Sequence, residues 1–545
     1  MLTTDELLAK RLYAEGVHTL FGVMGDANMH LVDSYVRHTP GTYISAARED
    51  SAVLMAHGYA RTTGRPGVVT VTCGPGFTNA ITALVEVVRS RSPLLLITGV
   101  PPESERSHVQ RIDQRALTRV IGADFVRVRS PKSLVADLTL ALRQAETEQA
   151  PVVLEMPYDW MDREPEEQEP ALIRAPGARV GPDEHSLGRF VDELSRARRP
   201  LVIGGRGVVL AGARDGLLQL ARSLGAPAAT TLQAKGLFSG YDAAIGVSGH
   251  YSTDFAKNVI AESDCIVAFG ASLNQFTNGL GKLFVGKTVM HCDIDPGQIG
   301  RWTATDFALV SDVATAVEAI QTRLTDHQPS TFADEVREAR RRWNPEDEFQ
   351  DESDDSSIDL RTFLIRLNAM LPANRTVISD AGRFMSAPTR YLDVEDPRKM
   401  LFTTSFGAIG LALGAGLGAA VGNPGDTTVV VAGDGGTMMN IAEFNSAVRH
   451  GLDVILVVVN DRGYGPEYFH LKEGGRDAEL ALFDWPSFAD TAVGLGALGM
   501  TIRNRRNLEA LADVLDERGR RPLLVEVVID PDVAVNPFYE HVDGS

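Results

Sequence analysis

HGYARTTGRPGVVTVTCGPGFTNAITALVEVVRSRSPLLLITG, at residues 57–99, is followed much later in the chain by AGLGAAVGNPGDTTVVVAGDGGTMMNIAEFNSAVRHGLDVILVVVND, at residues 415–461. Both stretches show the same order of small-residue helix, glycine turn, strand, glycine loop, helix and strand. Two copies at such a long spacing predict two related α/β modules, because a solenoid needs more copies at a shorter period.

The α/β pattern continues outside the repeat, since short aliphatic runs alternate with longer helical patterns, as in parallel sheets covered by helices on both faces. The clearest strands are Val68–Thr72, Leu94–Thr98, Leu201–Ile203, Cys265–Phe269, Thr428–Ala432 and Val454–Val459. Acidic, proline-containing stretches at 161–170 and 344–355 interrupt the pattern and are interpreted as linkers, although the second could be an acidic helical face. We therefore expect three doubly wound parallel-sheet domains, at about 1–165, 180–325 and 357–545.

Composition narrows the possible partners. The net charge of −19 repels phosphate backbones and anionic lipid, so neither nucleic acid nor a membrane surface is expected. Cys73, Cys265 and Cys292 are too few and too scattered for a disulfide framework or a zinc site, and their odd number suits a reducing compartment. No signal peptide is visible, and the longest apolar stretch, around 409–421, is too short to span a bilayer. The sequence predicts a cytoplasmic protein.

The glycine loops of the two repeat copies differ in one informative position. The first copy has Gly74-Pro75-Gly76, whereas the second has Gly433-Asp434-Gly435 at the carboxyl end of its strand, the edge at which open α/β sheets bind ligands. A helix expected to begin near Thr437 would point its free amides at a phosphate group. A carboxylate beside a diphosphate requires a bridging divalent cation, and Mg²⁺ accepts such mixed oxygen ligands. A simple turn remains an alternative for this loop taken alone.

The next strand supplies further oxygen atoms at the same edge. It ends at Asn460-Asp461-Arg462-Gly463, so that Asp461 and Asn460 become candidate metal ligands beside Asp434. The pair of strand ends predicts a two-point clip for a cation.

Together these residues resemble a known signature. Gly433-Asp434-Gly435, then 25 residues (436 to 460), then Asp461 looks like the thiamine diphosphate motif, in which GDG is followed by about 25 residues and an Asn pair. Here the second residue of the pair is Asp rather than Asn. Other segments resemble the acetolactate synthase, pyruvate decarboxylase and benzoylformate decarboxylase superfamily: FGVMGDANMHLVD at 21–33, AAREDSAVLMAHGYARTTGRPGVV at 46–69, GPGFTNAITAL at 74–84, HCDIDPGQIGR at 291–301 and SFGAIGLALGAGLGAA at 405–420.

The resemblance implies a role for each domain and for several residues. The first domain would bind the cofactor's pyrimidine, the third its diphosphate, and the middle one would be a central spacer. Glu49 would act at the aminopyrimidine nitrogen, and Ile409 would hold the cofactor bent, although Glu49 could be a surface residue and Ile409 simply core. Around the diphosphate and the metal, the resemblance implies contacts from Gly433, Gly435, Gly436 and Thr437, with the Gly463 carbonyl as a further metal ligand.

The expected reaction is decarboxylation of a 2-oxo acid, with possible ligation of the retained unit to an aldehyde or ketone. By resemblance, Asp26 and Glu467 would supply a proton after carbon dioxide leaves. His108 and Gln110 lie on one loop, where Gln110 resembles the acetolactate synthase glutamine and His108 could be ordinary surface. Tyr464, beside the metal loop, would line the site or only pack beneath it.

Several alternatives remain open at this point. The chain could be an acetolactate synthase-like carboligase, or a relative that binds the cofactor without turnover. A dinucleotide oxidoreductase is disfavoured, because no GxGxxG with a following acid is present. No FAD is expected, because the arginine-bearing segment of flavin-containing relatives is unmatched, although the glycine turn Gly204-Gly205-Arg206-Gly207 could hold a nucleotide. The family would build each site between two subunits, which predicts a homodimer or a homotetramer.

Overall fold

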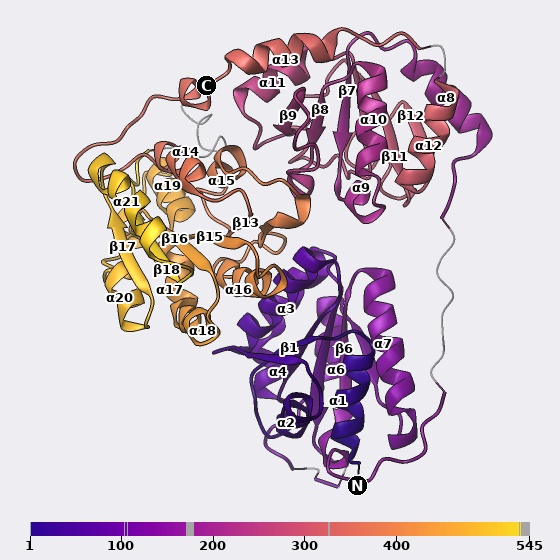
Figure 1. Ribbon diagram of the computed structural model, residues 1–545, viewed down its shortest axis with the longest axis vertical. Coiled ribbons are helices and arrows are strands. Elements are labelled where there is room, and N and C mark those ends of the chain that lie inside the picture. Colours follow the sequence, from indigo (N-terminus) through magenta and orange to yellow (C-terminus); the bar gives the residue numbers. More distant parts are fainter. Residues whose placement is uncertain are drawn as a thin grey trace. The chain divides into compact units, whose positions relative to one another are not determined.

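The computed structural model describes residues 2–102, 104–105, 107–170, 179–324, 327–533 and 535, which form three six-stranded sheets with flanking helices (Figure 1). The strand orders are β2-β1-β3-β4-β6-β5, β12-β11-β10-β7-β8-β9 and β14-β13-β15-β16-β18-β17. Every strand pair with a described register is parallel. The expected α/β class with three parallel sheets is confirmed.

The strands expected from the sequence are all present, and their ends differ by at most two residues from the expected ones. The first sheet contains β1 (Thr19–Gly22), β2 (Thr42–Ser45), β3 (Gly67–Val71), β4 (Leu94–Val100), β5 (Asp124–Arg127) and β6 (Pro151–Pro157). The second contains β7 (Pro200–Gly204), β8 (Ala228–Thr230), β9 (Ala244–Val247), β10 (Cys265–Phe269), β11 (Thr288–Asp293) and β12 (Phe307–Val310). The third contains β13 (Arg375–Ser379), β14 (Met400–Phe402), β15 (Thr427–Gly433), β16 (Val454–Asn460), β17 (Leu498–Ile502) and β18 (Leu523–Val528).

Helices connect these strands. Around the first sheet they are α1 (Thr4–Ala14), α2 (Met29–His38), α3 (Glu49–Thr63), α4 (Pro75–Asn79), α5 (Ile81–Arg89), α6 (Gln114–Ile121) and α7 (Leu134–Glu148). Next come α8 (Glu184–Leu194), α9 (Arg206–Leu210), α10 (Arg214–Leu224), α11 (Asp254–Glu262), α12 (Val313–Arg323), α13 (Phe332–Arg342), α14 (Leu360–Met370) and α15 (Ser386–Tyr391). The last are α16 (Ala412–Gly422), α17 (Asp434–Asn440), α18 (Phe444–Arg449), α19 (Gly465–Glu473), α20 (Phe488–Gly494) and α21 (Arg505–Glu517).

The two acidic stretches contain little regular structure. Residues 161–170 form neither helix nor strand, and within 344–355 only the 3-10 helix η4 (Pro345–Glu348) is present. The second stretch is therefore not the face of a longer helix, since α13 ends before it. The domain boundaries proposed from these linkers stay a prediction.

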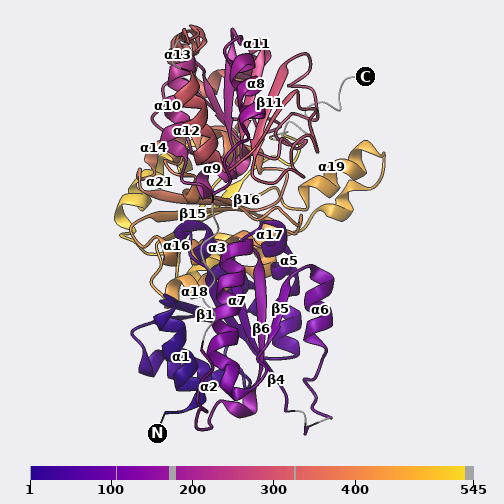
Figure 2. The ribbon, with the colours of Figure 1, turned by 90° about the vertical axis from the view of Figure 1, so that its right-hand side faces the viewer.

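By its internal contacts the chain forms two compact units, the first carrying the first and third sheets and the second carrying the middle sheet with α14 and α15. In the first unit, α1, α2 and α7 bury one face of the first sheet, while α3 and α5 bury the other (Figure 2). The core on the α3 side is continuous with the core beneath α16, α18 and α20 of the third sheet. The two repeat copies therefore share one hydrophobic core.

Glycines make this shared core possible, because the backbones of α3 and α16 touch. A Cβ added at Gly58 would lie 1.9 Å from the Ala415 carbonyl oxygen, and one at Gly418 would lie 1.8 Å from the Met55 carbonyl oxygen. Any larger residue at these positions would force the helices apart. The small-residue helices recognised in the repeat are thus the contact between its two copies.

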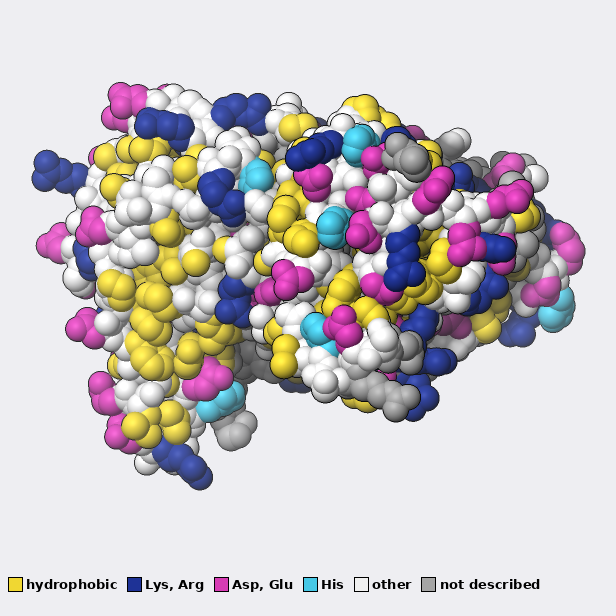
Figure 3. Space-filling model, turned by 90° about the horizontal axis from the view of Figure 1, so that it is seen from below, with side chains coloured by type: hydrophobic (Ala, Val, Ile, Leu, Met, Phe, Trp, Pro, Cys, Tyr) yellow, Lys and Arg dark blue, Asp and Glu magenta, His cyan; other side chains and the backbone are white. Residues whose placement is uncertain are grey.

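On the face shown in Figure 3, Lys and Arg side chains are interspersed with Asp and Glu side chains instead of gathering into one patch. None of the helices in the described part of the chain is long and apolar enough to cross a membrane.

Candidate active site

The Gly433–Thr437 segment lies where β15 ends and α17 begins. The expectation that the helix begins near Thr437 was wrong, because α17 already begins at Asp434. Both glycines after Asp434 are sterically required: a Cβ at Gly435 would lie 2.4 Å from Tyr464 Cε1, and one at Gly436 would lie 2.9 Å from Gly410 N. The glycines allow the loop to pack against two other segments of the third module, which is the part of the chain built around the third sheet; the first and middle modules are those built around the first and second sheets.

Asp434 is almost fully buried and is held by three donors. Its Oδ1 accepts from Gly435 N at 2.7 Å, and its Oδ2 accepts from Gly463 N at 2.9 Å and from Trp485 Nε1 at 3.0 Å. Burial, and secondly the negative charge of Asp461, raise the pKa of Asp434 to about 8. Two facing carboxylates in a buried site repel each other, and a divalent cation between them would remove that repulsion.

The second strand end is a tight loop at residues 460–464. Asp461 is buried, and Arg462 adopts the left-handed conformation with φ of 60°. The side chain of Asn460 is engaged on both sides, because its Nδ2 donates to Glu526 Oε1 at 2.8 Å and its Oδ1 accepts from Arg462 N at 3.0 Å. Gly463 is close to Asp434 through its amide, whereas metal binding by the Gly463 carbonyl and by Asn460 stays a prediction.

An aromatic wall, not foreseen from the sequence, supports this loop. The rings of Tyr464 and Phe483 meet edge-on at 4.9 Å, and Phe483 stacks on Trp485 at 4.8 Å. Tyr464 N donates to the carbonyl of Ala481, and Phe483 N donates to the carbonyl of Arg462. The 481–485 segment thereby fixes the backbone of the 460–464 loop and brings the Trp485 indole to Asp434.

Ile409 lies half-buried in the loop before α16, next to the Gly433–Thr437 segment. The following residue, Gly410, has φ of 82° and is held on both sides: its N–H donates to Asp380 Oδ2 at 2.7 Å, and its carbonyl accepts from Asn440 Nδ2 at 2.8 Å. Asp380 is completely buried, and burial raises its pKa to about 6. Asp380 was not expected from the sequence, because it lies just after β13 and no motif marks it.

On the first sheet, Glu49 is the first residue of α3 and is half-buried. Its Oε2 accepts from Asn79 Nδ2 at 3.1 Å, and a Cβ at Gly76 would lie 3.4 Å from its Oε1. The neighbouring Asp50 does not compete for this position, because it pairs with Arg48 at 3.1 Å. Glu49 therefore faces the glycine loop of the first repeat copy.

His108 and Gln110 lie at the same carboxyl edge of the first sheet. Gln110 Oε1 accepts from Cys73 Sγ at 3.4 Å, and His108 Nδ1 accepts from Gln110 N at 3.2 Å. The other ring nitrogen of His108 lies 3.4 Å from the Tyr158 hydroxyl. Burial is the main cause that raises the pKa values of Cys73 and Tyr158, and the charge of Asp26 adds to both shifts. Asp26, which is exposed, therefore lies near His108 and Gln110.

Glu467 is exposed in the first turn of α19, directly after the 460–464 loop. Tyr468 beside it is buried, with Lys472 Nζ 5.5 Å from its ring centroid. Glu467 thus belongs to the third module, whereas the other three proposed substrate residues belong to the first. The C-terminal segment 536–541, a further candidate for shaping the substrate pocket, lies outside the described residues.

The third-module site fits a diphosphate and a cation. Thr437 Oγ1 and Asn440 Oδ1 are buried without a hydrogen-bond partner beside the glycine loop, although such atoms are normally paired. No group of three or more His, Cys, Asp or Glu side chains suited to a metal occurs among the described residues. The carboxylates of Asp434 and Asp461 supply two such ligands, and Mg²⁺ commonly completes its shell with phosphate oxygens and water.

The glycine turn of the middle sheet is used by the protein itself. Gly205 N donates to the carbonyl of Phe269, and Gly207 N donates to the carbonyl of Gly270, both at 2.9 Å. A Cβ at Gly205 would lie 2.1 Å from the Gly270 carbonyl oxygen. Close packing against the end of β10 explains these glycines, and the absence of FAD stays a prediction.

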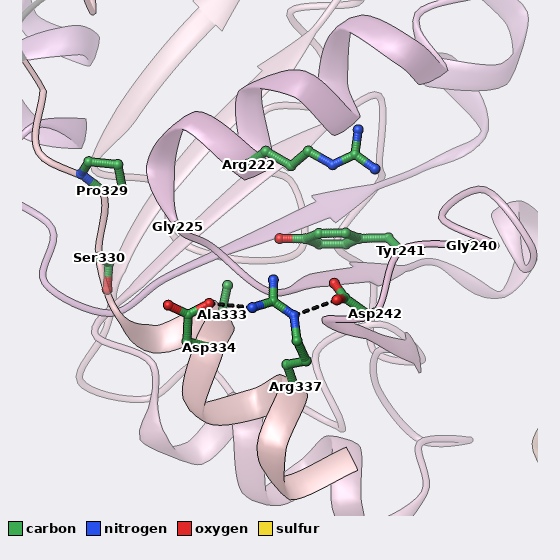
Figure 4. A pocket seen from close by; sticks show the side chains of 10 residues that line it. All are labelled: Arg222, Gly225, Gly240, Tyr241, Asp242, Pro329, Ser330, Ala333, Asp334 and Arg337. Carbon is green, nitrogen blue, oxygen red and sulfur yellow. Dashed lines mark hydrogen bonds and ion pairs between the residues drawn. The ribbon is translucent and has the colours of Figure 1, made fainter. Parts of the chain in front are cut away.

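The middle module contains a cavity of about 510 Å³ at the amino ends of β8 and β9 (Figure 4). Arg337 pairs there with both Asp242 and Asp334, and the Arg222 guanidinium lies 5.7 Å from the Tyr241 ring centroid. The cavity contains none of the expected site residues. The cavity lies at the amino edge of the middle sheet, opposite the carboxyl edge at which such sheets bind ligands.

All three modules match models of known protein domains. Residues 2–117 match the thiamine pyrophosphate enzyme N-terminal TPP binding domain, residues 187–320 the central domain and residues 380–527 the C-terminal TPP binding domain. The chain is 28% identical to acetolactate synthase isozyme 3 large subunit of Escherichia coli, covering 99% of this chain and 96% of that protein. It is 27% identical to a probable acetolactate synthase large subunit of Methanocaldococcus jannaschii (97% and 92% covered) and to sulfoacetaldehyde acetyltransferase of Rhodobacter capsulatus (98% and 96% covered).

Proposed function

Because the chain belongs to the thiamine pyrophosphate enzyme family, we propose that it binds thiamine diphosphate with Mg²⁺ to cleave or form the bond beside the carbonyl of a 2-oxo acid or 2-hydroxy ketone. The bound cofactor supplies a carbon that adds to a carbonyl and accepts the electron pair released with carbon dioxide. The observation that carries the proposal is the buried Asp434, which faces Asp461 and is held by Gly463 and Trp485.

In this proposal the third module holds the diphosphate end. Asp434 and Asp461 bind Mg²⁺, joined by the Gly463 carbonyl, and Asn460 orients the loop or adds an oxygen ligand. The orphaned hydroxyl of Thr437 bonds a diphosphate oxygen. Tyr464 covers the glycine loop and excludes water from the metal.

The first module acts on the pyrimidine. Glu49 holds a proton at the aminopyrimidine ring nitrogen, and its contact with Asn79 fixes the carboxyl group in place. Ile409 supports the cofactor from the third module, on a loop fixed by Asp380. Family membership supports an arrangement in which Glu49 and Asp434 of one site come from different subunits of a homodimer or homotetramer.

Decarboxylation with possible ligation is the proposed reaction. Asp26 and Glu467 donate the proton that releases an aldehyde, while His108 and Gln110 contact the substrate near its carbonyl. A second candidate is an acetolactate synthase-like carboligase, which agrees with the names of the relatives from Escherichia coli and Methanocaldococcus jannaschii. Three free cysteines support the cytoplasm as the place of action.

The test is a substrate panel. The purified protein, given thiamine diphosphate and Mg²⁺, receives 2-oxo acids with and without aldehyde acceptors while carbon dioxide and acyloin products are followed. Aldehyde as the main product supports the decarboxylase, and acyloin or acetohydroxy acid supports the carboligase. Cofactor binding with no product from any substrate would favour a non-catalytic relative.

A further inference from the structure

The third module holds the segment of the first module that leads into Glu49. Glu443, in the 3-10 helix η6 (Ile441–Glu443), is buried, and its two carboxylate oxygens accept from Ala47 N at 3.1 and 3.0 Å. Arg449 donates to Ser45 Oγ at 2.7 Å and to the Ser45 carbonyl at 3.1 Å. The strand-to-helix turn before Glu49 is therefore fixed by side chains from a distant part of the sequence.

The first module holds the segment of the third module that leads into Ile409. Glu86 on α5 is fully buried, and its carboxylate accepts from Ser405 N at 3.1 Å and from Phe406 N at 2.7 Å. The guanidinium of Arg89 lies 4.9 Å from the ring centroid of Phe406. This contact repeats the first one with the roles of the modules exchanged.

The two contacts occupy equivalent places in the repeat. When Pro66-Gly67 is aligned with Pro424-Gly425, counting backwards puts Ala47 opposite Ser405. The amides of Ala47 and Ser405, which donate to the two carboxylates, are thus at the same backbone position of the two copies. Reciprocal contacts of this kind make each module a scaffold for the other.

A carboxylate is an unusual choice for such a buried contact. Burying an ionised carboxylate carries a large desolvation cost, which apolar packing would avoid. In return, a carboxylate that accepts from backbone N–H groups, Ala47 N for Glu443 and both Ser405 N and Phe406 N for Glu86, restricts the backbone more tightly than apolar contacts do, because charge-assisted hydrogen bonds are strong and directional. Both carboxylates contact a backbone segment that lies only a few residues before a proposed site residue, Glu49 or Ile409.

We propose that Glu443 and Glu86 are positioning residues, Glu443 for the carboxyl group of Glu49 and Glu86 for the loop that carries Ile409. The inference rests on the proposed function for the roles of Glu49 and Ile409. The Glu443 contact with Ala47 and the Glu86 contact with Ser405 and Phe406 form two clamps. In a dimer whose sites combine the first module of one subunit with the third module of the other, the two clamps of one chain serve different active sites.

The experiment compares Glu443→Gln and Glu86→Gln in the full-length protein. Each variant keeps the side-chain shape but replaces one acceptor by an NH₂ group that opposes a backbone N–H. The control is Asp453→Asn, which removes a buried charge paired with Arg518 and Arg520 at the amino end of β16, the edge away from the site. Hydrogen–deuterium exchange is followed in peptides covering 45–51 and 403–409, together with thiamine diphosphate affinity and kinetics.

For Glu443→Gln we expect exchange about tenfold faster in 45–51 and a kcat about tenfold lower, with nearly unchanged cofactor affinity. For Glu86→Gln we expect faster exchange in 403–409 and cofactor affinity weaker by about tenfold. Asp453→Asn should change neither segment. A general loss of stability like that of the control, without these separate local effects, would overturn the proposal.

If a glutamine variant does not fold, Arg449→Ala and Arg89→Ala test the same clamps from exposed positions. Each should accelerate exchange in its own segment by a few-fold, and unchanged exchange in both would count against the clamps. Failure of the proposed function is distinguishable, because a wild-type protein that binds no thiamine diphosphate would still give a defined exchange result.

Discussion

Replacing Asp434 by Ala tests the metal site most directly. The substitution removes one of the two carboxylates proposed to bind Mg²⁺ and three hydrogen bonds, from Gly435, Gly463 and Trp485. A charge-assisted contact contributes roughly 1.5–3 kcal/mol, equivalent to a change of about 10- to 150-fold in affinity. Because the metal ligand and the support of Gly463 are lost together, Mg²⁺-dependent affinity for thiamine diphosphate should fall by about 100-fold or more.

The fold should survive this change, because two effects on stability oppose each other. The backbone N–H of Gly463 and the indole N–H of Trp485 lose their acceptor, which costs roughly 1–3 kcal/mol each. The repulsion between Asp434 and Asp461, which together with burial raises the pKa of Asp434 to about 8, disappears at the same time. The melting temperature of the cofactor-free variant should therefore lie close to that of the wild type.

The assay is calorimetric titration of thiamine diphosphate with and without Mg²⁺. Asp484→Asn, at an exposed carboxylate beside Trp485, is the matched control and should bind like the wild type. Trp485→Phe removes one bond to Asp434 Oδ2 and should weaken binding by roughly fivefold. Wild-type affinity of the Asp434→Ala protein in the presence of Mg²⁺ would refute the cation bridge.

Three further predictions address chemistry and pH. Glu49→Gln should bind thiamine diphosphate normally but lose at least about 100-fold in kcat, since an amide cannot hold the proton at the pyrimidine nitrogen; a near-normal rate in a steady-state assay would remove Glu49 from the mechanism. Asp26→Asn and Glu467→Gln should raise acyloin relative to aldehyde if the enzyme releases aldehyde, and should depress ligation if it is a carboligase; unchanged product ratios by chromatography would exclude both acids. Burial raises the pKa of Asp380 from 3.8 to about 6, so the folded protein binds the Asp380 proton more tightly than the unfolded protein does. The free energy of unfolding should therefore fall by roughly 3 kcal/mol as the pH rises from about 4 to 6. Denaturant unfolding of Asp380→Asn should lack this fall, and an unchanged pH profile would contradict it.

The strands and the carboxylates at their ends were predictable from the sequence because their determinants are local. Buried parallel strands are continuous aliphatic runs, as in Val454–Asn460, and Gly433-Asp434-Gly435 and Asp461 each lie at the end of such a run. The internal repeat predicted two related modules from the sequence alone. Three parallel sheets were therefore predicted correctly.

The start of α17 was misplaced for a local reason. Glycine disfavours helix in isolation, so Gly435 and Gly436 suggested that the helix begins after them. In the structure, Tyr464 and Gly410 leave no room for a Cβ at these positions, and tertiary packing places both glycines inside the first turn. Propensity was overridden by close packing.

The sequence by itself determined the α/β class, the repeat and the placement of carboxylates at two strand ends, since each depends on residues close together in the chain. The tertiary structure alone decided that Trp485 reaches Asp434, that Asp380 holds the Ile409 loop, and that buried glutamates of each module clamp the other. These partners are ordinary residues in ordinary local patterns, and their roles come from contacts between segments far apart in the chain. Such contacts are set by how the sheets and helices pack, which no local pattern encodes.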